Sequence, residues 1–241
     1  MLCALADGKL QCWYYPNAIY VDKDLMEHSK LTKDASDVGK LAQITHFTGN
    51  MISIVKLDGS SATLTVPPYA KILYEHVDQA DFEKAIRLCW FVKDRTLWGC
   101  LAAMSLYCRE LETSEIALAA IDEVDKVQFI NYIKELPSDA SKNAALALYC
   151  KKINEAETIL LQAKLYYRAI KMNIKLYWWE RALELALKYK THLDTVIGFW
   201  KQYLESMGKN EDSDKFKQYA REVTVDWEAI NWKIEQDKAA G

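Results

Sequence analysis

Beyond position 70, apolar residues recur with the spacing of amphipathic helices. The segment 177–189 has an apolar stripe at i, i+3, i+4 and i+7, opposite a face of charged residues. The segment 81–89 has the same design. Further apolar residues widen both stripes, so each helix is expected to contact neighbours on two sides. The stripes consist of Trp179, Ala182, Leu183 and Ala186, and of Phe82, Ala85, Ile86 and Cys89. This pattern predicts short helices packed as a stacked array.

An internal repeat supports the array. Residues 102–108 match residues 144–150 at an offset of 42, with five of the seven positions identical. The two helical stripes are 97 residues apart, which is not a multiple of 42, so the array is irregular. Helix pairs of this kind bury their apolar faces only by stacking. The sequence therefore predicts a mainly α fold, an irregular TPR-like α-solenoid.

The first 68 residues have a different pattern. The two Asp-Gly pairs at 7–8 and 58–59 each lie between β-rich runs. This is the strongest short hairpin signal, because a type I′ turn needs positive φ at both central residues. The run 42–47 is a further candidate strand, and the polar segment 22–40 is expected to be a long loop.

Two hairpins and one further strand cannot close a barrel or a sandwich, and they leave open sheet edges. A propeller blade has four strands in about 40–45 residues. We therefore expect a partial β-propeller, its last blade and a half, with a segment missing upstream. The expected domains are the partial propeller at 1–68, an α-solenoid of helical hairpins at 69–208, and a charged linker with terminal helices at 209–241.

Several residues are typical of helix ends. We expect N-caps at Asp94, Ser138 and Thr191, with Thr191 and Asp194 forming a capping box. Helix ends are expected near Pro137 and Gly208, the segment 209–215 is expected to be a charged linker, and a last helix is expected from Asp226.

Composition and charge exclude several classes of protein. Only 8 Gly and 4 Pro among 241 residues fit a largely helical chain. The net charge of −3 argues against nucleic acid as the partner, because binding to its phosphate backbone needs a basic face. The longest uncharged stretch, 41–55, is too short and too polar for a membrane helix, and no signal peptide is apparent, so we expect no membrane insertion. The six cysteines form no C-x-x-C pair and are expected to be reduced.

The sequence contains no recognisable cluster of catalytic or metal-binding residues. There is no phosphate-binding glycine loop, and the four histidines are isolated from one another and from close cysteine pairs. His192 is expected at a helix start. Cys108 and Cys150 occupy equivalent repeat positions, which favours packing over nucleophilic catalysis. We therefore expect no enzyme activity, no catalytic residues, no metal and no cofactor.

Aromatic residues make up 12% of the chain and are its richest feature. Most are expected in packing between helices. Neighbouring residues on a helix point about 100° apart, so one member of an adjacent pair can remain exposed. Exposed aromatic side chains are favoured anchors in protein interfaces. We therefore interpret two of the adjacent pairs as candidate partner-binding residues: Trp178, Trp179, Phe199 and Trp200.

Long runs of the chain resemble a known family, the 80-kDa WD-repeat subunit of intraflagellar transport complex B, in its C-terminal part. The runs that carry the resemblance are 13–22, 98–104, 125–134, 154–157, 180–196 and 225–228. The resemblance implies two upstream propellers followed by a helical-repeat tail. It also implies a non-catalytic structural subunit, a docking scaffold in ciliary trains that is needed for cilium assembly.

The same resemblance implies partners and a location. The partners are other complex B subunits, and a homodimer through the helical region stays open. The location is the cilium or flagellum, the ciliary base and the cytoplasm. The alternatives are a helical-repeat scaffold of another coat-like or nucleic-acid-binding assembly, and an enzyme built on helices.

Overall fold

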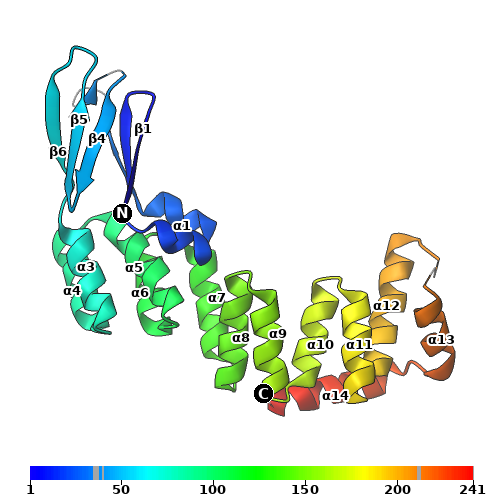
Figure 1. The fold of residues 1–241 in the computed structure, drawn as a ribbon. Helices are drawn as coiled ribbons and strands as arrows, with labels where there is room; N and C mark the ends of the chain where they lie inside the picture. The colour runs from blue at the N-terminus through cyan, green and yellow to red at the C-terminus, as the bar shows by residue number, and fades with distance from the viewer. Residues whose placement is uncertain (35–37, 40, 211–212, 241) are drawn as a thin grey trace. The chain divides into compact units, whose positions relative to one another are not determined.

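All described strands lie before residue 66, and most helices follow them, in the computed structural model, which describes residues 1–34, 38–39, 41–210 and 213–240, without the side chains of 239 and 240. The mainly α fold with a strand-rich start is as predicted (Figure 1). The chain divides into two units, Met1–Lys134 and Glu135–Gly241, and each is described by itself.

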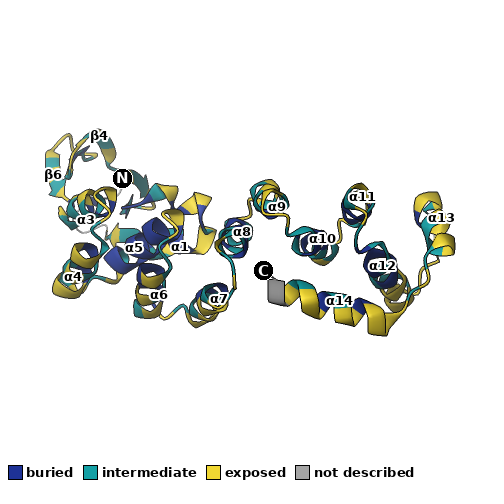
Figure 2. Ribbon diagram, turned by 90° about the horizontal axis from the view of Figure 1, so that it is seen from below, coloured by how far each residue is buried: buried dark blue, intermediate teal, exposed yellow. Residues whose placement is uncertain are grey.

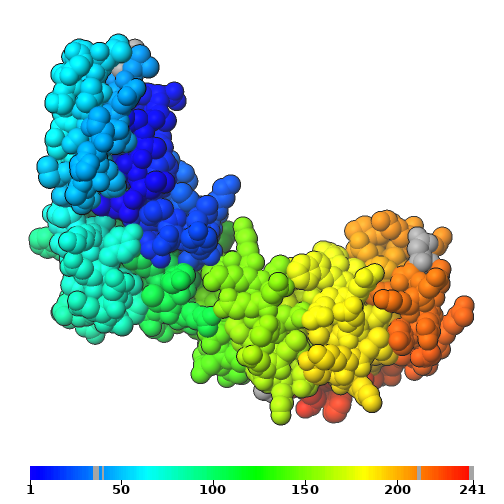
Figure 3. Space-filling view, in the orientation of Figure 1, coloured from blue at the N-terminus to red at the C-terminus, as the bar shows by residue number. Residues whose placement is uncertain are grey.

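The strands of the first unit form two antiparallel sheets of three strands each, with the orders β1-β2-β3 and β4-β5-β6. Figure 3 shows these segments, blue to cyan, gathered at one end of the unit. Six described strands replace the five expected. Their bounds are β1 Leu2–Ala6, β2 Lys9–Trp13, β3 Lys30–Lys33, β4 Gln43–Thr48, β5 Met51–Val55 and β6 Ser61–Thr65.

The two Asp-Gly hairpins differ in their turns. Asp7 and Gly8 both have positive φ, 51° and 71°, as the predicted type I′ turn requires. The prediction is wrong for the second turn, where only Gly59 has positive φ, 80°. There the Gly59 amide donates to the Lys56 carbonyl, and the Asp58 carboxylate accepts from the Ser60 amide. The side chain of Asp58 thus stabilises a longer loop.

The expected loop at 22–40 is wrong in its first half. It contains the helix α1 (Lys23–His28) and the strand β3, which follow the short 3₁₀ helix η1 (Pro16–Tyr20). Asp22 caps α1 by accepting from the Asp24 amide, and Leu25 is fully buried. One buried leucine and one cap fix a short helix whose charged surface suggested a loop. Residues 35–37 and 40 of the expected loop lie outside the described residues.

The helices of the first unit pack in sequence order, with α5 the most deeply buried (Figure 2). As predicted, Asp94 caps α5, accepting from the Thr96 amide. The apolar stripe predicted for 81–89 faces inward in α4 at Ala85 and Cys89. The helix bounds are α3 Tyr69–Asp78, α4 Phe82–Val92, α5 Arg95–Tyr107, α6 Leu111–Ala120 and α7 Val124–Lys134.

Helix α1 is fixed to α5 and α7 by a close approach and by charges. At Gly99 of α5, a Cβ would lie 2.7–2.8 Å from atoms of His28, two of them backbone atoms. The Nε2 atom of His28 lies 2.7 Å from Glu123 Oε1. Lys126 Nζ lies 2.9 Å from Asp22 Oδ2 and 3.4 Å from Glu123 Oε2. Burial alone would raise the pKa of Glu123, but His28 and Lys126 hold it below its usual value.

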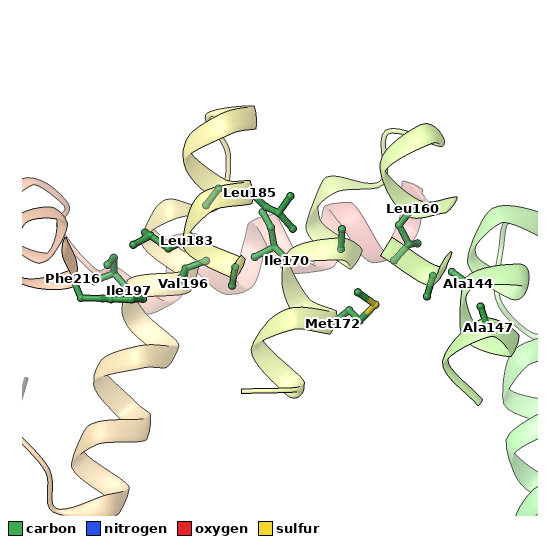
Figure 4. Close-up of a cluster of buried hydrophobic side chains, with 14 residues drawn as sticks. Ala144, Ala147, Leu160, Ile170, Met172, Leu183, Leu185, Val196, Ile197 and Phe216 are labelled. Atoms are coloured by element: carbon green, nitrogen blue, oxygen red, sulfur yellow. The ribbon is translucent and has the colours of Figure 1, made fainter. Parts of the chain in front are cut away.

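The helices of the second unit share a core that continues from helix to helix, as Figure 4 shows. It runs from Ala144 in α8 to Phe216 in α13, without one central cluster. The predicted stripe of α11 contributes Ala182, Leu183 and Ala186 to it. The helix bounds are α8 Asp139–Tyr149, α9 Ile153–Gln162, α10 Tyr166–Lys175, α11 Trp179–Tyr189, α12 Leu193–Met207, α13 Asp214–Glu222 and α14 Trp227–Ala240.

The internal repeat corresponds to two helix hairpins, α5–α6 and α8–α9, each in its own unit. Both turns contain a left-handed residue, Arg109 with φ 63° and Lys151 with φ 59°. Cys108 follows the last turn of α5 and is exposed, while Cys150 is half-buried. The expectation that both cysteines pack is therefore wrong for Cys108, although each cysteine is the C-cap of its helix.

The predictions for the last helices need two corrections. Ser138 caps α8 as expected, but the cap of α12 is His192, not Thr191, and Asp194 accepts from the Thr195 amide, so the expected capping box is absent. The expected linker at 209–215 already contains the start of α13 at Asp214, while residues 211–212 lie outside the described residues. Gly208 ends α12 with φ 61°, as predicted.

Candidate protein-binding site

The turn between α10 and α11 presents the first predicted aromatic pair. Tyr177 has a left-handed backbone, with φ 59°, and the next residue, Trp178, is the N-cap of α11. This tight turn leaves the side chain of Trp178 at 43% exposure, while Trp179 packs partly buried against the core of the second unit. The two adjacent tryptophans thus have different environments: Trp178 precedes the helix, and Trp179 is its first residue.

Trp179 belongs to an aromatic cluster formed by α11, α12 and α13. Its ring centroid lies 5.1 Å from that of Trp200 and 5.2 Å from that of Tyr203. Trp200 also contacts Phe216, at 4.8 Å between centroids. Such pairs contribute about 0.5–1.5 kcal/mol each beyond the area they bury. The cluster therefore holds the three helices together beside Trp178.

An open surface hollow of about 490 Å³ lies over this cluster. Aromatic rings form its floor, and charged residues of α11 form part of its rim. The lining residues are Tyr177, Trp178, Trp179, Glu180, Arg181, Glu184, Trp200, Ser213 and Phe216. A hollow of this type offers apolar area surrounded by polar groups, which is the arrangement of an interface centre and its rim.

Phe199 lies apart from the hollow. It packs against a second cluster, formed by Tyr167 of α10 and by Ile230 and Ile234 of α14, and its ring centroid lies 5.5 Å from that of Trp227. Phe199 and Trp200 are neighbours on α12 and point in different directions. The structure thus brings together three of the four predicted residues, and their role in binding a partner stays a prediction.

The rim of the hollow is held by an ion-pair network. Arg181 Nη2 lies 2.5 Å from Glu157 Oε1, and its Nη1 lies 3.1 Å from Glu184 Oε2. The amide of Asn173, a buried residue, donates to Glu157 at 2.9 Å. Burial alone would raise the pKa of Glu157, but the hydrogen bonds from Arg181 and Asn173 hold it below its usual value. Arg181 is therefore held by acidic partners beside the aromatic floor.

Three aromatic residues of the cluster and hollow were not predicted from the sequence. Tyr203 lies three positions after Trp200 on the same helix, so helical spacing could have found it. Tyr177 carries no signal because its role depends on a left-handed turn. Phe216 lies in α13, close after the segment assigned to the linker, and its burial to 2% exposure depends on tertiary contacts.

Other candidate chemistry is dispersed over the described chain. His192 is the N-cap of α12, as expected for a helix start, and its Nε2 lies 2.8 Å from Asp237 of α14. No group of three or more His, Cys, Asp or Glu among the described residues is arranged to hold a metal ion. In the same described part, none of the helices combines the length and apolarity needed to cross a bilayer.

Comparison with known proteins shows that two parts of the chain match family models. Residues 1–69 match the family model described as the IFT80 second beta-propeller, and residues 97–241 match that of the IFT80/172/WDR35/WDR19 TPR domain. The strand-rich and helical parts therefore correspond to the predicted propeller piece and TPR-like solenoid.

Curated relatives agree with these matches. The intraflagellar transport protein 80 homologs of rat and mouse are each 48% identical to this chain over 237 residues, which is 98% of the chain and 30% of the relative. The intraflagellar transport protein osm-1 of Caenorhabditis elegans is 27% identical over 167 residues, covering 57% of this chain and 9% of that protein. The chain thus spans about a third of the length of its rat and mouse relatives. It belongs to the IFT80 family of intraflagellar transport proteins.

Proposed function

We propose that the chain is a non-catalytic docking scaffold of intraflagellar transport complex B, active in ciliary trains and needed for cilium assembly. Its partners would be other complex B subunits, and a homodimer through the helical region is a further arrangement for the same surfaces. Its location would be the cilium or flagellum, the ciliary base and the cytoplasm. The parts would be a propeller piece at 1–68, a solenoid at 69–208 and terminal helices at 209–241.

Family membership supports this proposal, and the aromatic hollow is the single observation that carries the docking role. Trp178 is a large apolar side chain, exposed at 43%, on a turn that the surrounding contacts hold. The rings of Trp179 and Trp200 lie beside it in the same hollow. Aromatic anchors in such settings dominate the binding energy of protein interfaces. The slightly acidic chain offers no comparable basis for binding nucleic acid.

The test is affinity purification of the tagged chain from ciliated cells, with quantification of the proteins recovered. We expect complex B subunits with the unmodified chain, and about 10- to 30-fold less of the direct partner with Trp178→Ala, the effect of losing an interface anchor. Trp232→Ala is the matched control, because Trp232 of α14 is exposed at 66% and does not line the hollow.

Far-UV circular dichroism distinguishes loss of binding from loss of structure. Trp178→Ala is expected to retain the helical signal, because Trp178 precedes α11 and leaves the ring contacts of Trp179 in place. Recovery of only unrelated enzymes with the unmodified chain would contradict the scaffold. Equal recovery of complex B subunits with both tryptophan variants would remove the hollow from the proposal.

A further inference from the structure

Two cysteines face each other across the first hairpin. Cys3 of β1 and Cys12 of β2 are direct partners in the antiparallel register. Their Sγ atoms lie 3.0 Å apart, which is about 1 Å more than the ~2.0 Å of a disulfide bond. Both thiols are free. The backbone therefore already holds the two sulfur atoms close to bonding distance.

The hairpin around them is well defined. Its turn is the type I′ turn at Asp7 and Gly8, and its register runs without a shift from Leu2 opposite Trp13 to Ala6 opposite Lys9. A two-residue turn with the favoured backbone twist fixes which residues pair. Because the register is fixed, folding of the hairpin brings the two thiols next to each other.

The two thiols differ in access. Cys3 of the edge strand is half-buried, whereas Cys12 of the central strand is 1% exposed. A small oxidant in solution therefore reaches Cys3 first. Burial raises the pKa of Cys3, and it raises the pKa of Cys12 to about 12. Since the thiolate is the reacting form, oxidation is slow at neutral pH and accelerates as the pH rises.

We propose that Cys3 and Cys12 form a redox site, which hydrogen peroxide closes into a cross-strand disulfide. The Cys3 sulfur attacks one peroxide oxygen, the O–O bond breaks, and Cys3 becomes a sulfenic acid as one water leaves. The Cys12 sulfur then attacks the sulfenic sulfur, the S–O bond breaks, and a second water leaves with the Cys12 proton. In total, two thiols and one peroxide give one disulfide and two waters.

The disulfide would staple β1 to β2 within the first sheet. It would close a short loop around the type I′ turn, so it would hold the edge strand β1 in place even when the rest of the sheet opens. A thiol reductant would reverse the bond by exchange. This inference goes beyond the docking role proposed above and does not depend on it.

The experiment uses the folded, fully reduced chain and hydrogen peroxide. After the reaction, free thiols are alkylated, and the digested peptides are identified by mass spectrometry without reduction. We expect a peptide pair linked through Cys3 and Cys12, absent after dithiothreitol treatment and formed about tenfold faster near pH 9 than near pH 8, as the thiolate fraction rises with pH. Cys89→Ser, which alters a buried cysteine outside the hairpin, is the control expected to retain the link.

Cys12→Ser supplies a second readout. Without the resolving thiol, the sulfenic acid on Cys3 should persist and react with dimedone, while the unmodified chain gives disulfide instead. The inference is overturned if peroxide leaves both thiols free, if it converts Cys3 to sulfinic acid with no link, or if the linked pair contains other cysteines. The unmodified chain alone decides these outcomes, even if a variant folds poorly.

Discussion

Replacing Gly99 by alanine tests how tightly α1 is fixed to α5. The new Cβ would lie 2.7 Å from His28 Cβ and 2.8 Å from the carbonyl carbon and oxygen of His28. Ordinary contact begins near 3.4 Å. Two of the three atoms belong to the backbone, so no rotamer change can relieve the overlap. Helix α1 must shift or its contacts must stretch.

The size of the effect follows from two opposing terms. Alanine in place of glycine inside a helix stabilises by about 1 kcal/mol. Overpacking a close contact costs about 1–3 kcal/mol, and a backbone contact lies at the upper end of that range. The ion pairs that join His28 and Asp22 to α7 would also be strained as α1 moves. We therefore expect a net loss of about 2 kcal/mol, or about 4–8 °C in Tm for a chain of this size.

Urea unfolding measures the change in the free energy of unfolding. Hydrogen exchange locates the change in the chain, which is needed because the two units need not unfold together. Exchange should accelerate in α1 and α5. Gly198→Ala is the matched control, because its new Cβ would meet only side-chain atoms, of Val225, Ile230 and Trp227, at 3.2–3.4 Å. It should leave stability unchanged or slightly higher. If Gly99→Ala proves as stable as Gly198→Ala, the close approach of α1 and α5 is wrong.

Three further predictions concern the turns, the core and pH. The hydroxyl of Ser114 donates to that of Ser105 at 2.9 Å, and both residues are fully buried. Ser114→Ala should lower the free energy of unfolding in urea by about 1 kcal/mol. Changing both serines to alanine should cost less than the sum of the two single changes, and strict additivity would contradict this. Lys151→Gly should raise the free energy of unfolding by up to about 1 kcal/mol because Lys151 is left-handed, and a lower value would refute it. Burial lowers the pKa of His192 from its usual 6.5, although Asp237 opposes this. The contribution of neutral His192 to the free energy of unfolding should therefore be fully present above about pH 6.5 and decrease as the pH falls below it. His192→Asn should lose this dependence in urea titrations at several pH values; an unchanged slope would exclude His192 as its source.

The sequence predicted the elements whose signals are local. The stripe of α11 and the caps Asp94 and Ser138 depend on contacts within a few residues, and the structure has them. The type I′ turn at Asp7 is local in the same way. Helix ends were harder to find. Most turns between these helices use a left-handed residue other than glycine, for example Lys164 with φ 60°. No residue type marks such an end, because tertiary packing holds the unfavourable backbone.

The two copies of the internal repeat fill the same buried positions with different residues. At the offset of 42, Ser105 and Ser114 correspond to Ala147 and Ala156. One hairpin buries a hydrogen-bonded pair of hydroxyls, and the other buries two methyl groups of similar size. Both solutions leave no buried hydroxyl without a partner. The polar difference between the two repeats therefore occurs as a pair, in which each hydroxyl has a partner.

Tertiary contacts place the predicted aromatic residues of α12 on two different surfaces. Phe199 and Trp200 are adjacent, yet Phe199 contacts the cluster of α14 and Trp200 contacts the floor of the hollow. A helix places neighbours about 100° apart, so α12 serves both surfaces without sharing a side chain between them. Sequence alone could give the pairs but not their partners, since Phe216 and Ile230 come from helices later in the chain. The hollow is thus built on a helix whose opposite contacts fix it in place, and an aromatic anchor needs such fixing to bind without a large loss of entropy.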